Sequence, residues 1–130
     1  AKGLGFETSL DQDLQVRGER FLLLQAISNL LDNAIEFSPE GGHIRVESRR
    51  DGAHWCLSIQ DQGPGIPDYA QERLFERFFS TPRPESGRKS SGLGLSLVRE
   101  VVLLHGGEIR VDNAPGGGAV AVLRLPVAGR

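Results

Sequence analysis

Two asparagines, Asn29 and Asn33, are the first residues whose type and spacing could do chemistry. They are four residues apart, so on a helix they share one face, and Glu36 lies near that face one turn further on. Asparagine is unfavourable inside a helix, and its amide needs several hydrogen-bond partners. One interpretation is a solvated polar face. The other is a side-chain oxygen directed at a hard cation such as Mg²⁺, which prefers oxygen ligands.

A second cluster combines an acid with two glycines and directly follows a strand-like run: Asp61-Gln62-Gly63-Pro64-Gly65-Ile66-Pro67. Glycines let the backbone pass close to a flat ligand. A carboxylate at the end of a strand can accept a hydrogen bond from an exocyclic amine. Taken alone, the motif is explained equally well by a plain turn.

A third cluster opens the last helical pattern, with the residues Ser90-Ser91-Gly92-Leu93-Gly94-Leu95. Small residues before a helix N-terminus expose backbone N–H groups at the positive end of the helix dipole, which is typical of an anion site. The cluster is not a Walker A loop, because no Gly-Lys-Ser/Thr follows at the required spacing. It is not a Rossmann fingerprint either, because that glycine spacing is absent.

Two helices must position the first and third clusters. The first is predicted from Glu19 to about Phe37, where Ser38-Pro39 and Gly41-Gly42 end it. Its apolar residues recur at helical spacing: Leu23, Ala26, Ile27, Leu30, Leu31 and Ala34. The second helix is predicted from Gly92-Leu93 to His105, with Gly106-Gly107 in the position of a C-cap.

Strands must position the second cluster. Residues 44–47 and 55–59 alternate with period two, and Asp51-Gly52 between them predicts a type I′ hairpin. Residues 109–112 and 119–125 predict a closing hairpin around a Pro-Gly-Gly-Gly turn. Near the N-terminus, residues 6–10 and 14–17 indicate either two strands or a strand and a loop.

Together the elements predict one domain over residues 1–130, with the order β, α, ββ, α, loop, α, ββ. The middle helix covers about residues 68–79, and residues 82–91 form a loop without periodicity. This order is typical of an α+β two-layer sandwich. We expect a mixed, mostly antiparallel sheet of about five strands, covered on one face by three helices.

Composition excludes several classes of function. The 130 residues include 15 basic and 17 acidic side chains, so the net charge of −2 gives no field that would hold nucleic acid. The single cysteine, Cys56, cannot form an internal disulfide, which favours a reducing compartment such as the cytoplasm. No apolar run approaches the ~18–20 residues of a transmembrane helix, so we expect a soluble fragment.

In this order and spacing, the clusters resemble the catalytic and ATP-binding domain of bacterial sensor histidine kinases. That domain has the Bergerat fold, which DNA gyrase, the Hsp90 chaperones and MutL share. Residues 29–38 resemble the N box, 61–65 the G1 box, 74–79 the F box and 91–95 the G2 box. The stretches 65–69, 75–79 and 89–95 look most like the CreC-type sensor kinases.

The resemblance implies a role for each matching residue. Asn33 would ligate Mg²⁺, Asp61 would accept from the adenine amine, and residues 80–91 would form an ATP lid. The residues implied in catalysis are Asn29, Asn33, Arg77 and Lys89, with Arg83 and Arg88 as further phosphate contacts. The residues implied in nucleotide binding are Asn33, Phe37, Asp61, Gly63, Gly65, Ile66, Ser91, Gly92, Leu93, Gly94 and Leu95.

The resemblance also implies an in-line transfer of the γ-phosphate of Mg²⁺-ATP to a histidine, in two-component signal transduction. None of His43, His54 and His105 lies in an acceptor-type helix. The acceptor is therefore expected on dimerisation helices that precede this chain in a longer parent. The parent is expected to be a membrane-bound homodimer that signals to a response regulator, and the fragment itself a cytoplasmic monomer.

Three positions depart from the family pattern. Glu36 stands where many members have Lys or Arg, Ser90 replaces the first glycine of the G2 box, and Ala119 replaces a common Thr. A carboxylate at position 36 should repel phosphates unless it points away or helps to hold the metal. These departures leave open a nucleotide-binding regulatory module with weak or no kinase activity. An anti-sigma-type serine kinase, a class that shares these boxes, is the other alternative.

Overall fold

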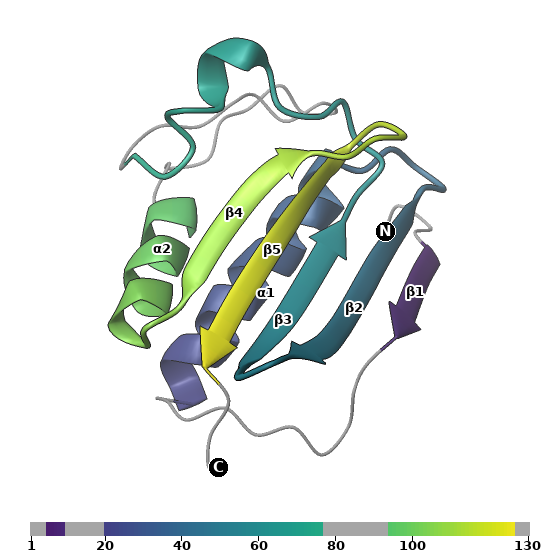
Figure 1. Cartoon of the computed structure of the whole chain (residues 1–130). Coiled ribbons are helices and arrows are strands. Elements are labelled where there is room, and N and C mark those ends of the chain that lie inside the picture. Colours follow the sequence, from purple (N-terminus) through teal and green to yellow (C-terminus); the bar gives the residue numbers. More distant parts are fainter. Residues whose placement is uncertain (1–4, 10–19, 77–93, 127–130) are drawn as a thin grey trace.

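Five strands form one sheet in the order β1-β2-β3-β5-β4 (Figure 1). The structure is a computed structural model that describes residues 5–9, 20–76 and 94–126. The strands are β1 (Gly5–Ser9), β2 (His43–Asp51), β3 (His54–Gln60), β4 (Glu108–Asn113) and β5 (Ala119–Pro126). β1 pairs with β2 in parallel, and the other neighbours pair antiparallel, which confirms the predicted mixed, mostly antiparallel sheet. The possible strand at residues 14–17 lies outside the described residues.

Two α-helices, α1 (Arg20–Phe37) and α2 (Gly94–Leu104), cover one face of this sheet (Figure 1). Both begin and end within two residues of the predicted bounds. The apolar stripes of the helices meet every second side chain of the strands, so the alternation and the helical period fill one core. The buried core consists of Ala26, Leu30, Ala34, Ile44, Leu57, Ile59, Val98, Val101, Val102, Leu123 and Leu125. No helix in the described part of the chain is long and apolar enough to cross a membrane.

The third predicted helix, over residues 68–79, is wrong for the residues that the structure describes. A short 3₁₀ helix, η1 (Asp68–Ala70), is followed by turns that reach Glu76, and residues 77–79 lie outside the described residues. Backbone N–H groups of Ala70 and Glu76 bond three residues back, to Pro67 and Arg73. Only Ala70 is fully buried in this segment, so too few apolar contacts exist to favour an α-helix.

α2 ends in the glycine cap that the sequence predicts. Gly106 has φ +76°, and its N–H bonds to the carbonyl of Leu103 at 3.0 Å. The next N–H, from Gly107, reaches back to Val102 at 2.9 Å. These two bonds form a Schellman motif, which satisfies carbonyl groups at the helix end. The chain can then turn directly into β4.

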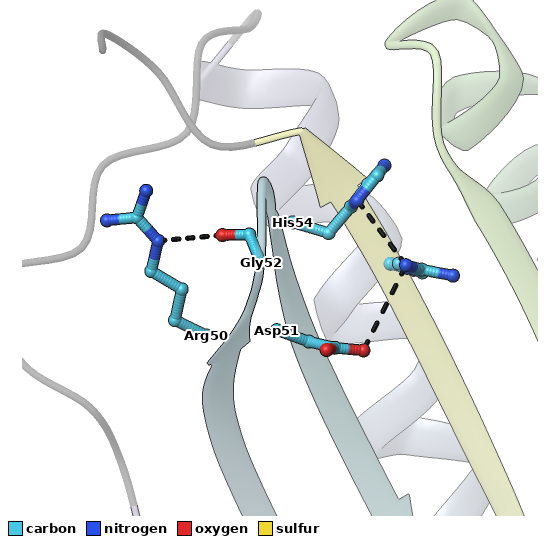
Figure 2. A network of polar contacts seen from close by, with 5 residues as sticks. Arg50, Asp51, Gly52 and His54 are labelled. Carbon is cyan, nitrogen blue, oxygen red and sulfur yellow. Dashed lines mark hydrogen bonds and ion pairs between the residues drawn. The ribbon is translucent and has the colours of Figure 1, made fainter.

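The β2–β3 hairpin and the end of β5 meet at one end of the sheet, which we call the hairpin end. The strand register pairs Asp51 with His54, so the turn residues are Gly52 and Ala53, with φ +65° at Gly52. Figure 2 labels Asp51 and His54 and draws the polar contacts around them as dashed lines. Arg124 Nη2 lies 3.9 Å from Asp51 Oδ2 and 3.4 Å from His54 Nδ1. These contacts are long and partly exposed, so they add little to stability.

Candidate functional site

Those predicted binding residues that the structure describes lie toward the opposite end of the sheet, which we call the loop end. β3 ends there at Gln60, β4 ends at Asn113 and β5 begins at Ala119. The end of α1 and the first residue of β2 lie at the same end, as does the start of α2 (Figure 1). Three other parts of the chain, residues 37–43, 94–95 and 113–119, therefore lie at the same end of the sheet as the loop that follows β3, residues 61–66.

Asp61 is the most enclosed polar residue of this loop, with 7% of its surface exposed. Its Oδ1 accepts hydrogen bonds from the backbone N–H groups of Gly63 at 2.8 Å and Ala119 at 3.1 Å. Burial raises the pKa of the carboxyl above its ordinary value, and the two backbone donors oppose that shift. Oδ2 makes no hydrogen bond to any residue that the structure describes, so it can accept one from a ligand.

The rest of the loop is held by two amide side chains. Gln62 Oε1 accepts from the N–H of His43 at 2.7 Å, which ties the loop to the start of β2. Asn113 makes a reciprocal pair with Ile66: its Oδ1 accepts from the backbone N–H at 2.6 Å, and its Nδ2 donates to the carbonyl at 3.2 Å. The loop of residues 61–66 is thus held at Asp61, Gln62 and Ile66.

Close backbone packing explains the two glycines of the loop. A Cβ at Gly63 would overlap the carbonyl oxygen of Phe37, at the end of α1. Gly65 has φ +84°, and a Cβ there would lie 2.6 Å from Asn113 Oδ1. Both glycines therefore have a packing role besides the ligand approach that the sequence suggests.

One row of α1 consists of the two asparagines Asn29 and Asn33 and the aromatic Phe37, which are four residues apart and half-buried. It runs beside the buried stripe, so these side chains are partly covered and partly exposed. The structure brings Phe37 against Gly63, and Asn33 lies one turn before it. Asn29 lies a further turn away from the loop end, and Glu36 is exposed.

The third cluster is described only in part. Gly94 and Leu95 form the first turn of α2, where both are half-buried. The other predicted phosphate and lid residues lie outside the described residues: Arg77, Arg83, Arg88, Lys89, Ser90, Ser91, Gly92 and Leu93. In the ranges that the structure describes, no group of three or more His, Cys, Asp or Glu side chains could hold a metal ion.

Sequence reasoning missed the β4–β5 turn as part of the site. Gly118 has φ +81°, and a Cβ there would overlap the carbonyl oxygen of Asp61. Ala119 binds the Asp61 carboxylate through its backbone N–H, so this contact needs no threonine hydroxyl. A signal for Asn113 was present in the sequence: this polar residue follows Ile109 and Val111 in the two-residue alternation of the strand, and in the structure it is exposed.

Known proteins match this chain in both sequence and fold. A model of the family "Histidine kinase-, DNA gyrase B-, and HSP90-like ATPase" matches residues 18–129. The sensor protein CreC of Escherichia coli K12 is 51% identical over 113 residues, which cover 87% of this chain and 24% of CreC. The chain therefore spans about a quarter of the length of that relative.

Solved structures agree with the sequence matches. The mycobacterial sensor histidine kinase MprB superposes with a TM-score of 0.84 at 40% identity, covering 98% of this chain and 85% of that one. The histidine kinase ThkA, solved in complex with the response regulator protein TrrA, superposes with a TM-score of 0.80 at 31% identity. That match covers 96% of this chain and 34% of ThkA.

Proposed function

The chain belongs to the family of histidine kinase-, DNA gyrase B- and HSP90-like ATPases, and from that premise we propose that it binds Mg²⁺-ATP and supplies the γ-phosphate to a histidine of its parent sensor kinase. Its relatives are sensor histidine kinases, and this chain corresponds to their ATPase domain. A response regulator is the proposed downstream partner, by analogy with the complex of ThkA and TrrA.

The observation that carries the proposal is the geometry of Asp61. Two backbone N–H groups occupy Oδ1 and fix the carboxylate, while Oδ2 can accept from the exocyclic amine of adenine. Guanine has a carbonyl oxygen at the equivalent ring position, which would face the carboxylate without a donor. Fixed acceptors of this kind discriminate strongly, because the wrong ligand leaves a buried polar group unpaired.

The phosphates would lie toward the start of α2 and the Asn33 side of α1. The first turn of α2 presents the positive end of the helix dipole, which favours an anion. Ser91, Gly92 and Leu93 would extend this contact, and Lys89 and Arg77 would add positive charge. The side-chain oxygen of Asn33 fits Mg²⁺ as a ligand, and the ion when bound supplies neutralisation of phosphate charge.

In the proposed transfer, the bond between the γ-phosphorus and the bridging oxygen breaks as a bond to an imidazole nitrogen forms, and ADP leaves. His54 and His105 lie at the hairpin end of the sheet, away from Asp61. His43 begins β2, and its side chain is exposed. We therefore assign the acceptor to the part of the longer parent that this chain does not span.

The first test is calorimetric titration with a non-hydrolysable ATP analogue, with and without Mg²⁺. We expect Mg²⁺-dependent binding by the wild type and at least tenfold weaker binding by Asp61→Asn, about the effect of one buried charged hydrogen bond. Asp51→Asn makes the same chemical change at the hairpin end and should leave the affinity unchanged. Absence of binding by the wild type would contradict the proposal.

Transfer is tested with the parent protein and γ-labelled ATP. An acid-labile phosphate on histidine would support the proposed kinase. Binding without transfer would favour the regulatory module instead, and an acid-stable phosphoserine on a partner would favour the serine kinase. Exposed Glu36, on the last turn of α1, is the described residue that motivates the regulatory alternative.

A further inference from the structure

The turn between β4 and β5 holds both ends of the Asp61 loop. At one end of the turn, Ala119 exchanges backbone hydrogen bonds with Asp61 and its carboxylate: Asp61 N–H donates to the Ala119 carbonyl at 2.9 Å, and Ala119 N–H donates to Oδ1 at 3.1 Å. At the other end, Asn113 makes its reciprocal pair with Ile66. The turn itself is closed by the N–H of Ala114, which donates to the Gly118 carbonyl at 2.9 Å.

We propose that Asn113 is a positioning residue. It fixes Ile66, at the end of this loop, and thereby the direction in which the Asp61 carboxylate faces the adenine base. The inference rests on the proposed function, because it concerns how that same site selects its nucleotide. Asn113 does not itself contact the base in this account. It acts through Ile66 and Gly65, and both lie on the loop that carries Asp61.

The contact geometry favours an amide at this position. Ile66 offers one backbone donor and one backbone acceptor, and only an amide side chain offers one of each at matching spacing. This pairing replaces the strand neighbour that the loop lacks. Gly65 packs against the same amide oxygen and near the Gly118 carbonyl, so the loop lies directly on the turn.

Loss of Asn113 would release one end of the loop and leave the other attached. The bonds between Asp61 and Ala119 would remain, so the carboxylate would stay buried. The Gly63 N–H lies on the released part of the loop and would hold Oδ1 less firmly, so the direction of the carboxylate would vary. An acceptor with variable direction binds adenine more weakly. It also rejects guanine less strongly, because rejection depends on holding the carboxylate against the wrong group.

The experiment measures the Kd of non-hydrolysable ATP and GTP analogues for the wild type, Asn113→Ala and Asn113→Asp. We expect Asn113→Ala to bind the ATP analogue about tenfold more weakly, the effect of losing one to two hydrogen bonds. The ratio of its Kd for the GTP analogue to its Kd for the ATP analogue should fall by a similar factor. Asn113→Asp has the same shape but places an oxygen against the Ile66 carbonyl, so its loss should equal or exceed that of Asn113→Ala.

Asp112→Asn is the matched control, one residue earlier on the same strand. Its exposed carboxylate contacts Arg110 at 3.4 Å, away from the loop, so both affinities should stay within about twofold of the wild type. A ligand-free measurement accompanies the titrations: hydrogen exchange of the Ile66 amide, which should accelerate in both Asn113 variants and not in the control.

The outcomes separate this inference from the proposed function. If the wild type binds the ATP analogue and Asn113→Ala keeps the same affinity and the same ATP preference, the positioning role is overturned. A narrowed preference with faster Ile66 exchange supports it, even if the variant is less stable. A wild type that protects the Ile66 amide but binds neither analogue overturns the proposed function, and with it the selection of adenine through Asn113.

Discussion

The loop end and the hairpin end of the same sheet are held together by different kinds of contact. At the loop end, Asp61, Gln62 and Asn113 bind backbone groups at 2.6 to 3.2 Å across 2 to 58 residues of sequence. At the hairpin end, the contacts of Arg124 with Asp51 and His54 are 3.9 and 3.4 Å long and partly exposed. The hairpin end has one short side-chain bond to backbone, from Arg50 Nε to the Gly52 carbonyl at 2.9 Å, and it joins residues only two apart (Figure 2). The loop end is therefore held by short bonds between distant segments, and the hairpin end by one local bond and two long contacts.

The difference follows from what each end needs. A two-residue turn such as Gly52-Ala53 is specified by its own residues and by the paired strands on either side of it. The seven residues between β3 and η1 have no such ladder. Its conformation depends on contacts from distant segments, and such loops usually carry function on a rigid scaffold. The comparison predicts that changes at the two ends separate stability from ligand binding.

The largest effect is expected from alanine at two of the three glycines whose Cβ would overlap a backbone carbonyl, Gly118 and Gly107. A Cβ at Gly118 would overlap the Asp61 carbonyl, and one at Gly107 would overlap the Arg124 carbonyl. Each substitution should lower the free energy of unfolding by on the order of 3 kcal/mol in urea titrations. Only Gly118→Ala should also weaken ATP-analogue binding by the folded protein. Gly116→Ala, in open space, is the control and should change both quantities little.

A smaller pair of effects is expected at two glycines with positive φ. Gly52→Ala has open space around its Cβ, so only the backbone strain remains, about 1 kcal/mol. Gly65→Ala adds a close contact with Asn113 and should cost about 2 kcal/mol by thermal or urea unfolding. The comparison would fail if Gly52→Ala changed nucleotide affinity, or if Gly65→Ala did not.

Asp61→Asn should increase stability while it removes binding. Because burial raises the pKa of this carboxyl, the folded state holds its proton more tightly than the unfolded state, and ionisation costs stability as pH rises through the raised pKa. The asparagine variant should therefore be more stable than the wild type at neutral pH. The gain should shrink as pH falls through that pKa toward 3.8, the ordinary value. Urea unfolding across this range measures it, and a gain that grew on acidification would contradict the assignment.

The smallest effect is expected at the ion pair of the hairpin end. Asp51→Asn removes the charge that faces Arg124 at 3.9 Å, and should change the free energy of unfolding by at most about 0.5 kcal/mol. Differential scanning calorimetry at low and high salt would detect a larger contribution. If Asp51→Asn lowered the free energy of unfolding by more than about 1 kcal/mol, the contacts of the hairpin end would contribute more to stability than their length indicates, and the contrast between the two ends would be weaker.

The sequence predicts most reliably those structural features that depend on residues close together in the chain. α1 and α2 follow from an apolar stripe and a terminal glycine or proline, and the two hairpins follow from alternation around short turns. The predicted helix at residues 68–79 fails over residues 68–76, where only Ala70 is fully buried. The sequence motif identifies Asp61 and Gly63, but it does not identify the residues from distant parts of the chain that contact this loop. Asn113 is 47 residues away from Ile66, and only the strand register brings them together.

The parallel pairing of β1 has a consequence for the order of folding. The β2–β3 and β4–β5 hairpins close over short stretches of chain, but Gly5 pairs with His43 across the whole of α1. Closing a longer loop has a higher entropic cost before any contact compensates for it. We expect β1 to join the sheet last during refolding. In native-state exchange the amides at the β1–β2 edge should open at lower free energy than those of β3 and β5 in the centre.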